Sequence, residues 1–265
     1  MKHCARTKAG CRRCEGQLPF DFNMAFQPIV DVAAGRIHAY EALVRGPSGA
    51  TARDILDRVS PLDLYRFDQA CRVKAIDQAS HLGMTASLSI NFLPNAVYEP
   101  EACLEATLEI SRRLGWPADR LTFEIVESEA VRDREHLRNI IATYREHGFC
   151  IALDDFGSGY ANLDLLVELT PDSLKLDRLM VTACHRDPRR QTVLAAILGM
   201  ARELDVEVVA EGVELQAEAS WLLAAGIRLQ QGFYYGSPCF NALSDVPVER
   251  MAAVQQASGR DVVPS

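Results

Sequence analysis

Polar side chains recur at intervals along this chain, each within or just after a short apolar run. They are Glu41, Asn91, Glu124, Asp154, Asp155, Lys175, Glu211 and Gln231. The carboxylate and amide oxygens among them, without histidine or cysteine, form the hard ligand set that Mg²⁺ or Mn²⁺ prefers. Several ionised carboxylates in one partly desolvated place would repel each other unless a cation lay among them. The set therefore predicts a site for divalent metal ions.

The adjacent acids Asp154 and Asp155 suggest two ions, with one aspartate bridging them. Two metal ions about 3.5–4 Å apart stabilise both the attacking and the leaving oxygen of an in-line phosphoryl displacement. Lys175 could orient the attacking water or neutralise charge at phosphorus, and Glu211 could accept the proton of that water. A turn capped by the aspartates, and a lysine that only neutralises nearby acids, are the plainer interpretations of the same residues.

A loop with two glycines, Phe156–Tyr160, directly follows the aspartates. Glycine permits positive φ and a close approach of the backbone to a ligand. We therefore expect a mobile loop beside the site, whose conformation is coupled to activity.

Eight short β-rich runs carry or precede the polar residues. We expect strands at Met24–Val30, Ile37–Val44, Leu88–Phe92, Leu121–Val126, Phe149–Leu153, Ser173–Leu176, Val206–Ala210 and Arg228–Gln230. Helical patterns lie between most of them or close the chain, at Pro61–Leu82, Glu101–Leu114, Asp133–His147, Ala161–Leu169, Pro188–Leu204, Gln216–Ala225 and Val246–Gln256. Strands that alternate with helices pair in parallel, with the helices outside. Eight of them predict an α/β fold, a TIM-like (β/α)8 barrel, in which the polar residues converge at the carboxyl ends of the strands.

The first two strands are an exception to this alternation. Only Asp31–Arg36, which includes Gly35, separates them, and this is too short for a right-handed crossover. The connection predicts a hairpin, so that one strand of the barrel runs antiparallel to its neighbours.

The composition is that of a globular protein with a full core, since 48% of the 265 residues are hydrophobic and 24% are charged. No apolar run is long enough to span a membrane, and the first residues lack the apolar region of a secretory signal, so we expect a cytoplasmic protein. The net charge of −8 argues against binding of nucleic-acid polymers. We expect a barrel domain over residues 21–258, between tails at residues 1–20 and 259–265.

The N-terminal tail carries His3, Cys4, Cys11 and Cys14. These side chains offer enough ligands for a tetrahedral zinc site. Four cysteines would be a stronger pattern than three with a histidine near the end of the chain. We therefore favour a solvated basic tail whose cysteines have no specific role, and zinc binding is the alternative.

Short motifs occur in a fixed order over roughly residues 22–240. They are Phe26–Val30, Glu41–Arg45, Asn91–Phe92, Glu124–Glu127, Asp154–Tyr160, Lys175–Asp177, Glu211–Glu214 and Gln231–Phe233. As a set they resemble the EAL-domain family of cyclic di-GMP phosphodiesterases, which is named after the tripeptide found here as Glu41-Ala42-Leu43. The ensemble is specific, although the tripeptide alone is not.

The resemblance implies a homodimeric enzyme on a barrel with one antiparallel strand, which hydrolyses cyclic di-GMP to linear 5′-pGpG with Mg²⁺ or Mn²⁺. The implied metal ligands are Glu41, Asn91, Glu124, Asp154 and Asp155. Lys175 and Glu211 would act on the water, and Glu127 would hold the glycine loop. The implied substrate contacts are Gln27, Leu43, Arg45 and Gln231. Ser237 departs from the family's pattern, because many members have a basic residue there.

Two other classes of function use the same barrel: a silent receptor for cyclic di-GMP and a protein-interaction module. A degenerate member should have lost a metal ligand, Lys175 or Glu211, and none is lost here. The sequence therefore favours the active enzyme. Two nearby residues have plainer interpretations, since Glu214 could only cap or salt-bridge the following helix and Gln231 could only hydrogen-bond its loop.

Overall fold

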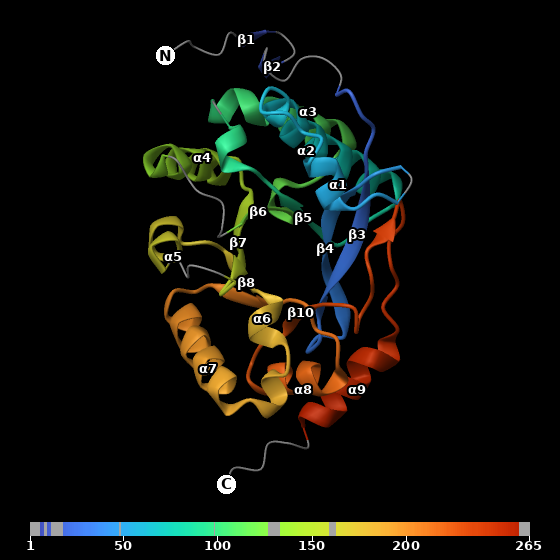
Figure 1. Ribbon diagram of the computed structural model, residues 1–265, viewed down its shortest axis with the longest axis vertical. Helices are drawn as coiled ribbons and strands as arrows, with labels where there is room; N and C mark the ends of the chain where they lie inside the picture. The colour runs from blue at the N-terminus through green and yellow to red at the C-terminus, as the bar shows by residue number, and fades with distance from the viewer. Residues whose placement is uncertain are drawn as a thin grey trace.

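The computed structural model describes residues 6–7, 10–11, 18–47, 49–97, 99–126, 133–158 and 163–259. In this part of the chain, helices surround a central set of strands (Figure 1). The strands are β1 (Arg6–Thr7), β2 (Gly10–Cys11), β3 (Asn23–Asp31), β4 (Arg36–Arg45), β5 (Ser87–Asn91), β6 (Leu121–Val126), β7 (Cys150–Phe156), β8 (Ser173–Leu176), β9 (Glu207–Ala210), β10 (Leu229–Gln231) and β11 (Cys239–Phe240).

The helices follow the strands in the order that the sequence predicts. They are α1 (Ala52–Leu56), α2 (Leu64–His81), α3 (Pro100–Leu114), α4 (Arg134–Glu146), α5 (Leu163–Leu169), α6 (Arg178–Val181), α7 (Pro188–Glu203), α8 (Gln216–Ala224) and α9 (Val248–Ser258). Short 3₁₀ turns are η2 (Pro94–Ala96), η3 (Ala118–Arg120) and η4 (Cys184–Arg186). The sequence pattern does not predict α1, α6 or β11, because elements this short show no periodicity.

Nine of the described strands form one sheet in the order β10-β9-β8-β7-β6-β5-β4-β3-β11. β10 also pairs with β3, so the strands from β3 to β10 close into a barrel. Neighbours from β4 to β10 are parallel, whereas β3 runs antiparallel to β4 and to β10. The predicted TIM-like barrel with one antiparallel strand is confirmed.

A tight turn explains the antiparallel strand. The carboxylate of Asp31 accepts a hydrogen bond from the amide of Ala34 at 3.0 Å, as aspartate does in turns. Gly35 has a φ of 66°, a conformation that glycine adopts without steric cost. The chain therefore reverses within a few residues, and β4 pairs with β3 along its whole length.

Strand β7 ends three residues later than the sequence predicts. It continues to Phe156, so Asp154 and Asp155 lie within the strand and not after it. Its pairing with β8 shifts between Leu153 and Phe156, and Asp155 has a φ of 57°, which is unusual for a residue other than glycine. An irregularity of this kind redirects side chains beside a site, and here it lets two successive acids join one cluster.

Side-chain alternation separates the polar residues Asn91 and Glu124 from the core. Asn91 and Glu124 are paired across β5 and β6. The next residue after Asn91, Phe92, and the one before Glu124, Phe123, are fully buried and pack against Tyr144 of α4. Because neighbouring side chains on a strand point to opposite faces, the helices cover the phenylalanines while the polar groups face the barrel interior.

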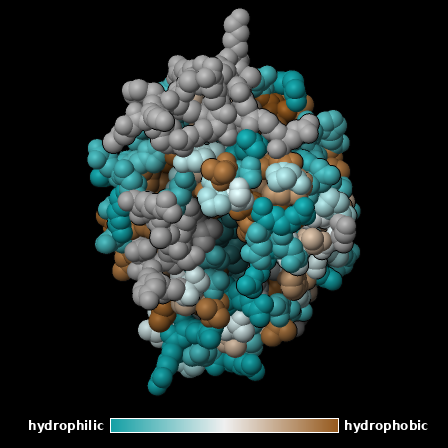
Figure 2. Space-filling model, turned by 45° about the horizontal axis from the view of Figure 1, so that its top comes forward, coloured by the Kyte–Doolittle hydropathy of each residue, from teal (hydrophilic) through white to brown (hydrophobic). Residues whose placement is uncertain are grey.

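On the face shown in Figure 2, hydrophilic residues predominate among those coloured and line a hollow near the centre. Apolar residues occur there in small groups, as they do on most protein surfaces. Among the described helices, none combines the length and the apolar character that a membrane crossing requires.

Candidate active site

Lys175 lies at the centre of a group of carboxylates inside the barrel. Its ammonium nitrogen is 2.7 Å from Glu211 Oε1, 2.9 Å from Glu124 Oε2, 3.1 Å from Asp154 Oδ1 and 3.7 Å from Glu41 Oε2. The lysine is 1% exposed. The sequence predicts that residues from β4, β6, β7, β8 and the end of β9 converge, and in the structure these five do.

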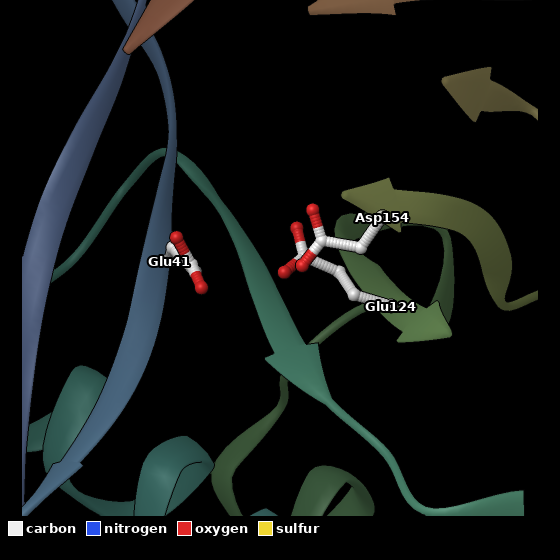
Figure 3. Close-up of side chains that lie close together, drawn as sticks. All are labelled: Glu41, Glu124 and Asp154. Atoms are coloured by element: carbon white, nitrogen blue, oxygen red, sulfur yellow. The ribbon is translucent and has the colours of Figure 1, made fainter. Parts of the chain in front are cut away.

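Two groups of acids are spaced for metal ions. Glu41, Glu124 and Asp154 each offer an oxygen within 4.8 Å of the others, and so do Asp154, Asp155 and Glu211. Figure 3 shows the carboxylates of the first group directed toward one another from β4, β6 and β7. Asp154 belongs to both groups, as a bridging ligand would. Glu211, predicted to be a proton acceptor, is also placed where it could ligate an ion.

Two buried oxygens at this site have no hydrogen-bond partner, and this tests whether the residues fit a metal. They are Glu124 Oε1 and Gln231 Oε1. A buried carboxylate oxygen without a partner is costly, and a hard cation would satisfy it. The amide groups of Asn91 and Gln231 each donate to Glu41, at 3.0 and 2.8 Å, and orient its carboxylate. The donor set therefore fits Mg²⁺ or Mn²⁺.

Burial and mutual repulsion raise the pKa values of acids in this site. Burial, with the nearby charges of Glu41 and Asp154, raises the pKa of Glu124 to about 8 despite Lys175. Burial and Asp154 raise the pKa of Asp155 to about 6. Burial alone would lower the pKa of Lys175, but the surrounding carboxylates outweigh it and raise that pKa well above the usual range. The site therefore holds a charged lysine among acids that need more positive charge.

A cavity of about 280 Å³ opens above this cluster. It is lined by Gln27, Glu41, Leu43, Asp155, Asp177, Arg178, Glu211, Gly212, Glu214, Gln231, Gly232 and Phe233. The predicted substrate contacts Gln27, Leu43 and Gln231 are thus brought together. Sequence reasoning assigned no role to Arg178 or Phe233. Arg178 directly follows the motif Lys175–Asp177 and Phe233 is the last residue of the motif Gln231–Phe233, so both positions could have been considered.

Arg45, also predicted to contact substrate, does not line this cavity in the described structure. Its guanidinium donates to the carbonyl of Val44 at 2.8 Å. Glu214 forms an ion pair with Arg178 of α6 at 3.6 Å, whereas its plainer interpretation named the following helix, α8. The loop anchor Glu127 and the tail residues His3, Cys4 and Cys14 lie outside the described residues, as does the side chain of Cys11.

The segment after β9, which carries Glu211, and the segment after β10 are held together by backbone hydrogen bonds. The amide of Val213 donates to Gln231 at 3.0 Å, and the carbonyl of Val213 accepts from Tyr234 at 3.0 Å. Gly232 lies so close to Val213 that an added Cβ would be 2.1 Å from its carbonyl oxygen. Only glycine leaves room for this approach, which holds Glu211 and Gln231 at their places.

Gly232→Ala is therefore expected to separate the two segments and to destabilise the protein by about 3 kcal/mol. Gly199→Ala is the matched control, because Gly199 is in helix α7 and an added Cβ would have open space. The control should gain up to about 1 kcal/mol, since alanine favours helix. Chemical denaturation of the three proteins measures both changes, and a Gly232→Ala variant as stable as the wild type would contradict this role of Gly232.

Comparison with known proteins decides the family of the chain. A family model described as the EAL domain matches residues 19–238. The chain belongs to the EAL domain family. The acids, the lysine and the cavity described above are therefore those of an EAL domain, and the resemblance inferred from the sequence is confirmed.

Solved and curated proteins resemble this EAL domain over most of its length. A standalone EAL protein from Vibrio cholerae O395, solved with c-di-GMP bound, is 45% identical with a TM-score of 0.85, and the match covers 88% of this chain and 99% of that one. Klebsiella pneumoniae BlrP1, in a manganese and cyclic di-GMP complex, is 32% identical with a TM-score of 0.81, and the match covers 87% and 59%.

Among curated proteins, the probable cyclic di-GMP phosphodiesterase PdeG of Escherichia coli is 32% identical over 80% of this chain and 44% of its own. The antirepressor BluF of the same organism is 30% identical over 84% of this chain and 56% of its own. This EAL domain thus spans about half the length of these curated relatives.

Proposed function

We propose that this EAL domain hydrolyses cyclic di-GMP to linear 5′-pGpG with two Mg²⁺ or Mn²⁺ ions. One observation carries the proposal: four of the five predicted acids surround a buried lysine, and all five form two groups that share Asp154. Relatives named as phosphodiesterases, and solved relatives in complex with cyclic di-GMP, supply the reaction and the substrate.

The metal ligands follow from the two groups of acids. Glu41, Asn91, Glu124 and Asp154 would hold one ion, and Asp154, Asp155 and Glu211 would hold the other. When bound, such ions supply positive charge to the phosphodiester and lower the pKa of water. Asn91 can take part only if its amide turns its oxygen toward the ion, since its nitrogen donates to Glu41.

Lys175 contributes a fixed positive charge. Its hydrogen bond to Glu124 and its ion pairs with Asp154 and Glu211 hold the buried ammonium in one place. A charge placed before the reaction stabilises an attacking hydroxide or the developing phosphorane charge without reorganisation. In the absence of metal ions, burial raises the pKa of Glu211 well above its usual range. With an ion bound, Glu211 would accept the proton of the attacking water through a carboxylate oxygen that does not ligate that ion.

Residues that line the cavity would contact the nucleotide. The amide of Gln27 is held by the carbonyl of Gly236 at 3.1 Å, and Leu43 offers an apolar wall. Phe233 is 61% exposed at the mouth, where a purine could stack on it. Since acids dominate the floor, a phosphodiester would bind only together with cations.

Turnover should therefore depend on a divalent metal with oxygen preference. We expect Mg²⁺ or Mn²⁺ to support hydrolysis, chelator to abolish it, and Ca²⁺ to bind yet support it poorly because its geometry is looser. Purified protein is incubated with cyclic di-GMP and each metal, and products are separated by chromatography. Unchanged hydrolysis in excess chelator would refute the metal mechanism.

BluF, one of the relatives, is named as an antirepressor, and this name favours a second candidate function without catalysis. A silent receptor or an interaction module would bind nucleotide or protein without turnover. The retained acids and Lys175 favour the enzyme, since a module without turnover does not need them. A homodimer and a cytoplasmic location stay predictions.

A further inference from the structure

A buried ion pair lies behind the metal ligands, on the side of the barrel wall that faces the helices. Asp68 and Arg72, one turn apart on α2, are 3% and 1% exposed. Arg72 Nη2 lies 2.8 Å from Asp68 Oδ2. A buried pair of this kind gives little net stability over apolar residues of similar volume. Its presence therefore calls for another role.

The second oxygen of Asp68 reaches the end of β5. Asp68 Oδ1 accepts a hydrogen bond from the amide of Leu93 at 3.0 Å. β5 ends at Asn91, and the amide of Phe92 still donates to the carbonyl of Glu124 at 3.0 Å. Leu93 is the next residue, where the strand ladder stops, so its half-buried amide takes its acceptor from another element. Asp68 thus fixes the chain two residues after a predicted metal ligand.

Arg72 links the same pair to the other strand. Its Nη1 donates to the hydroxyl of Tyr144 on α4 at 3.1 Å. The ring of Tyr144 packs on Phe123 with 4.9 Å between centroids and on Phe92 with 5.5 Å. These phenylalanines are the sequence neighbours of Glu124 and Asn91. The contacts of the pair therefore end directly behind two of the oxygens proposed to bind metal.

We propose that Asp68 and Arg72 are positioning residues, which set the places of Asn91 and Glu124 and thereby the affinity for the metal ion. This inference rests on the proposed function, since it concerns the same site. The carboxylate of Asp68 is the key element, because it is the acceptor that ends β5 in a defined conformation. Groups behind metal ligands commonly change metal affinity about 10–100-fold when they are removed.

Two double variants separate positioning from stability. D68N/R72M removes both charges but keeps an amide oxygen that can accept from Leu93. D68L/R72M removes the charges and the acceptor. Each replaces the ion pair by uncharged groups of similar volume, a change that is often neutral for stability. Mn²⁺ binding is measured by calorimetry without nucleotide, and the free energy of unfolding is measured on the same samples.

We expect D68N/R72M to bind Mn²⁺ about threefold more weakly than the wild type, because the hydrogen bond from Arg72 to Tyr144 is lost. D68L/R72M also loses the acceptor for Leu93, and we expect it to bind Mn²⁺ about thirtyfold more weakly, within the usual range. Equal binding by the two double variants would overturn the positioning role. If the wild type itself bound no Mn²⁺, the proposed function would fail first, and that result is distinct from equal, strong binding by all three proteins.

Tyr144→Phe decides the question if D68L/R72M does not fold. It removes one hydroxyl from the network and keeps the aromatic packing. We expect Mn²⁺ binding about threefold weaker, as the loss of one hydrogen bond implies. Ser111→Ala is the control, because it removes another buried hydroxyl, which donates to Thr107 within α3 at 2.8 Å. Unchanged binding in Tyr144→Phe would then overturn the proposal.

Discussion

Lys175→Met should lower turnover about 10²–10⁴-fold, because the charge that assists the attacking water is lost. Substrate affinity should change far less, since Lys175 is not among the residues that line the cavity. The variant should show this as a fall in kcat at nearly constant KM. Steady-state kinetics at saturating Mn²⁺ measure both quantities.

The same substitution should also lower the free energy of unfolding when chelator keeps the site free of metal ions. Four carboxylates lie within 3.7 Å of the ammonium group, and without it they would be buried together with no cation. Removing one partner of a buried ion pair typically costs about 3–5 kcal/mol. Lys74→Met is the control, because that lysine donates to Phe22 and Asn23 and lies over the Phe22 ring, and it belongs neither to the cavity lining nor to the groups of acids. If Lys175→Met lost kcat and substrate affinity equally, Lys175 would be a substrate-binding residue and not one that acts on the water.

Asp154→Asn should abolish turnover, with a loss of about 10³-fold or more, since a metal ion contributes several kcal/mol to the transition state. Asp154 is chosen because it belongs to both groups of acids. In chelator the variant should be as stable as the wild type or about 1 kcal/mol more stable, since repulsion among the acids falls. Kinetics and thermal melting on one preparation test both parts.

Glu214→Gln is the matched control for this variant. Glu214 lines the same cavity, but it pairs with Arg178 at 3.6 Å and belongs to neither group of acids. An exposed pair of this kind is worth little, so turnover should stay within about threefold of the wild type. Substantial turnover by Asp154→Asn, or an equal loss in both variants, would contradict the assignment of the metal ligands.

The sequence predicted the barrel and most of the cluster because both depend on patterns that repeat. Each polar residue such as Asn91 or Glu124 stands at a similar place on its strand, and parallel strands bring such places together. The hairpin was predictable from loop length alone. The short elements α1 and α6 were not, since four or five residues carry no period.

Other features depend on contacts that no local pattern encodes. The irregularity in β7 arises from pairing with β8, and it places Asp155 at positive φ although its neighbours read as a regular strand. Asp68 and Arg72 stand one turn apart, as many surface pairs do, and only the fold shows that the pair is buried against Leu93.

The most direct test of the proposed hydrolysis is a single-turnover reaction in water enriched in heavy oxygen. Protein in excess over cyclic di-GMP is mixed with Mn²⁺, and the products are separated and weighed by mass spectrometry. Attack by water at one phosphodiester predicts linear 5′-pGpG that carries a single heavy oxygen on its terminal phosphate. Recovery of the cyclic nucleotide intact, from protein shown to bind both Mn²⁺ and the nucleotide, would contradict the proposal and make the chain a receptor.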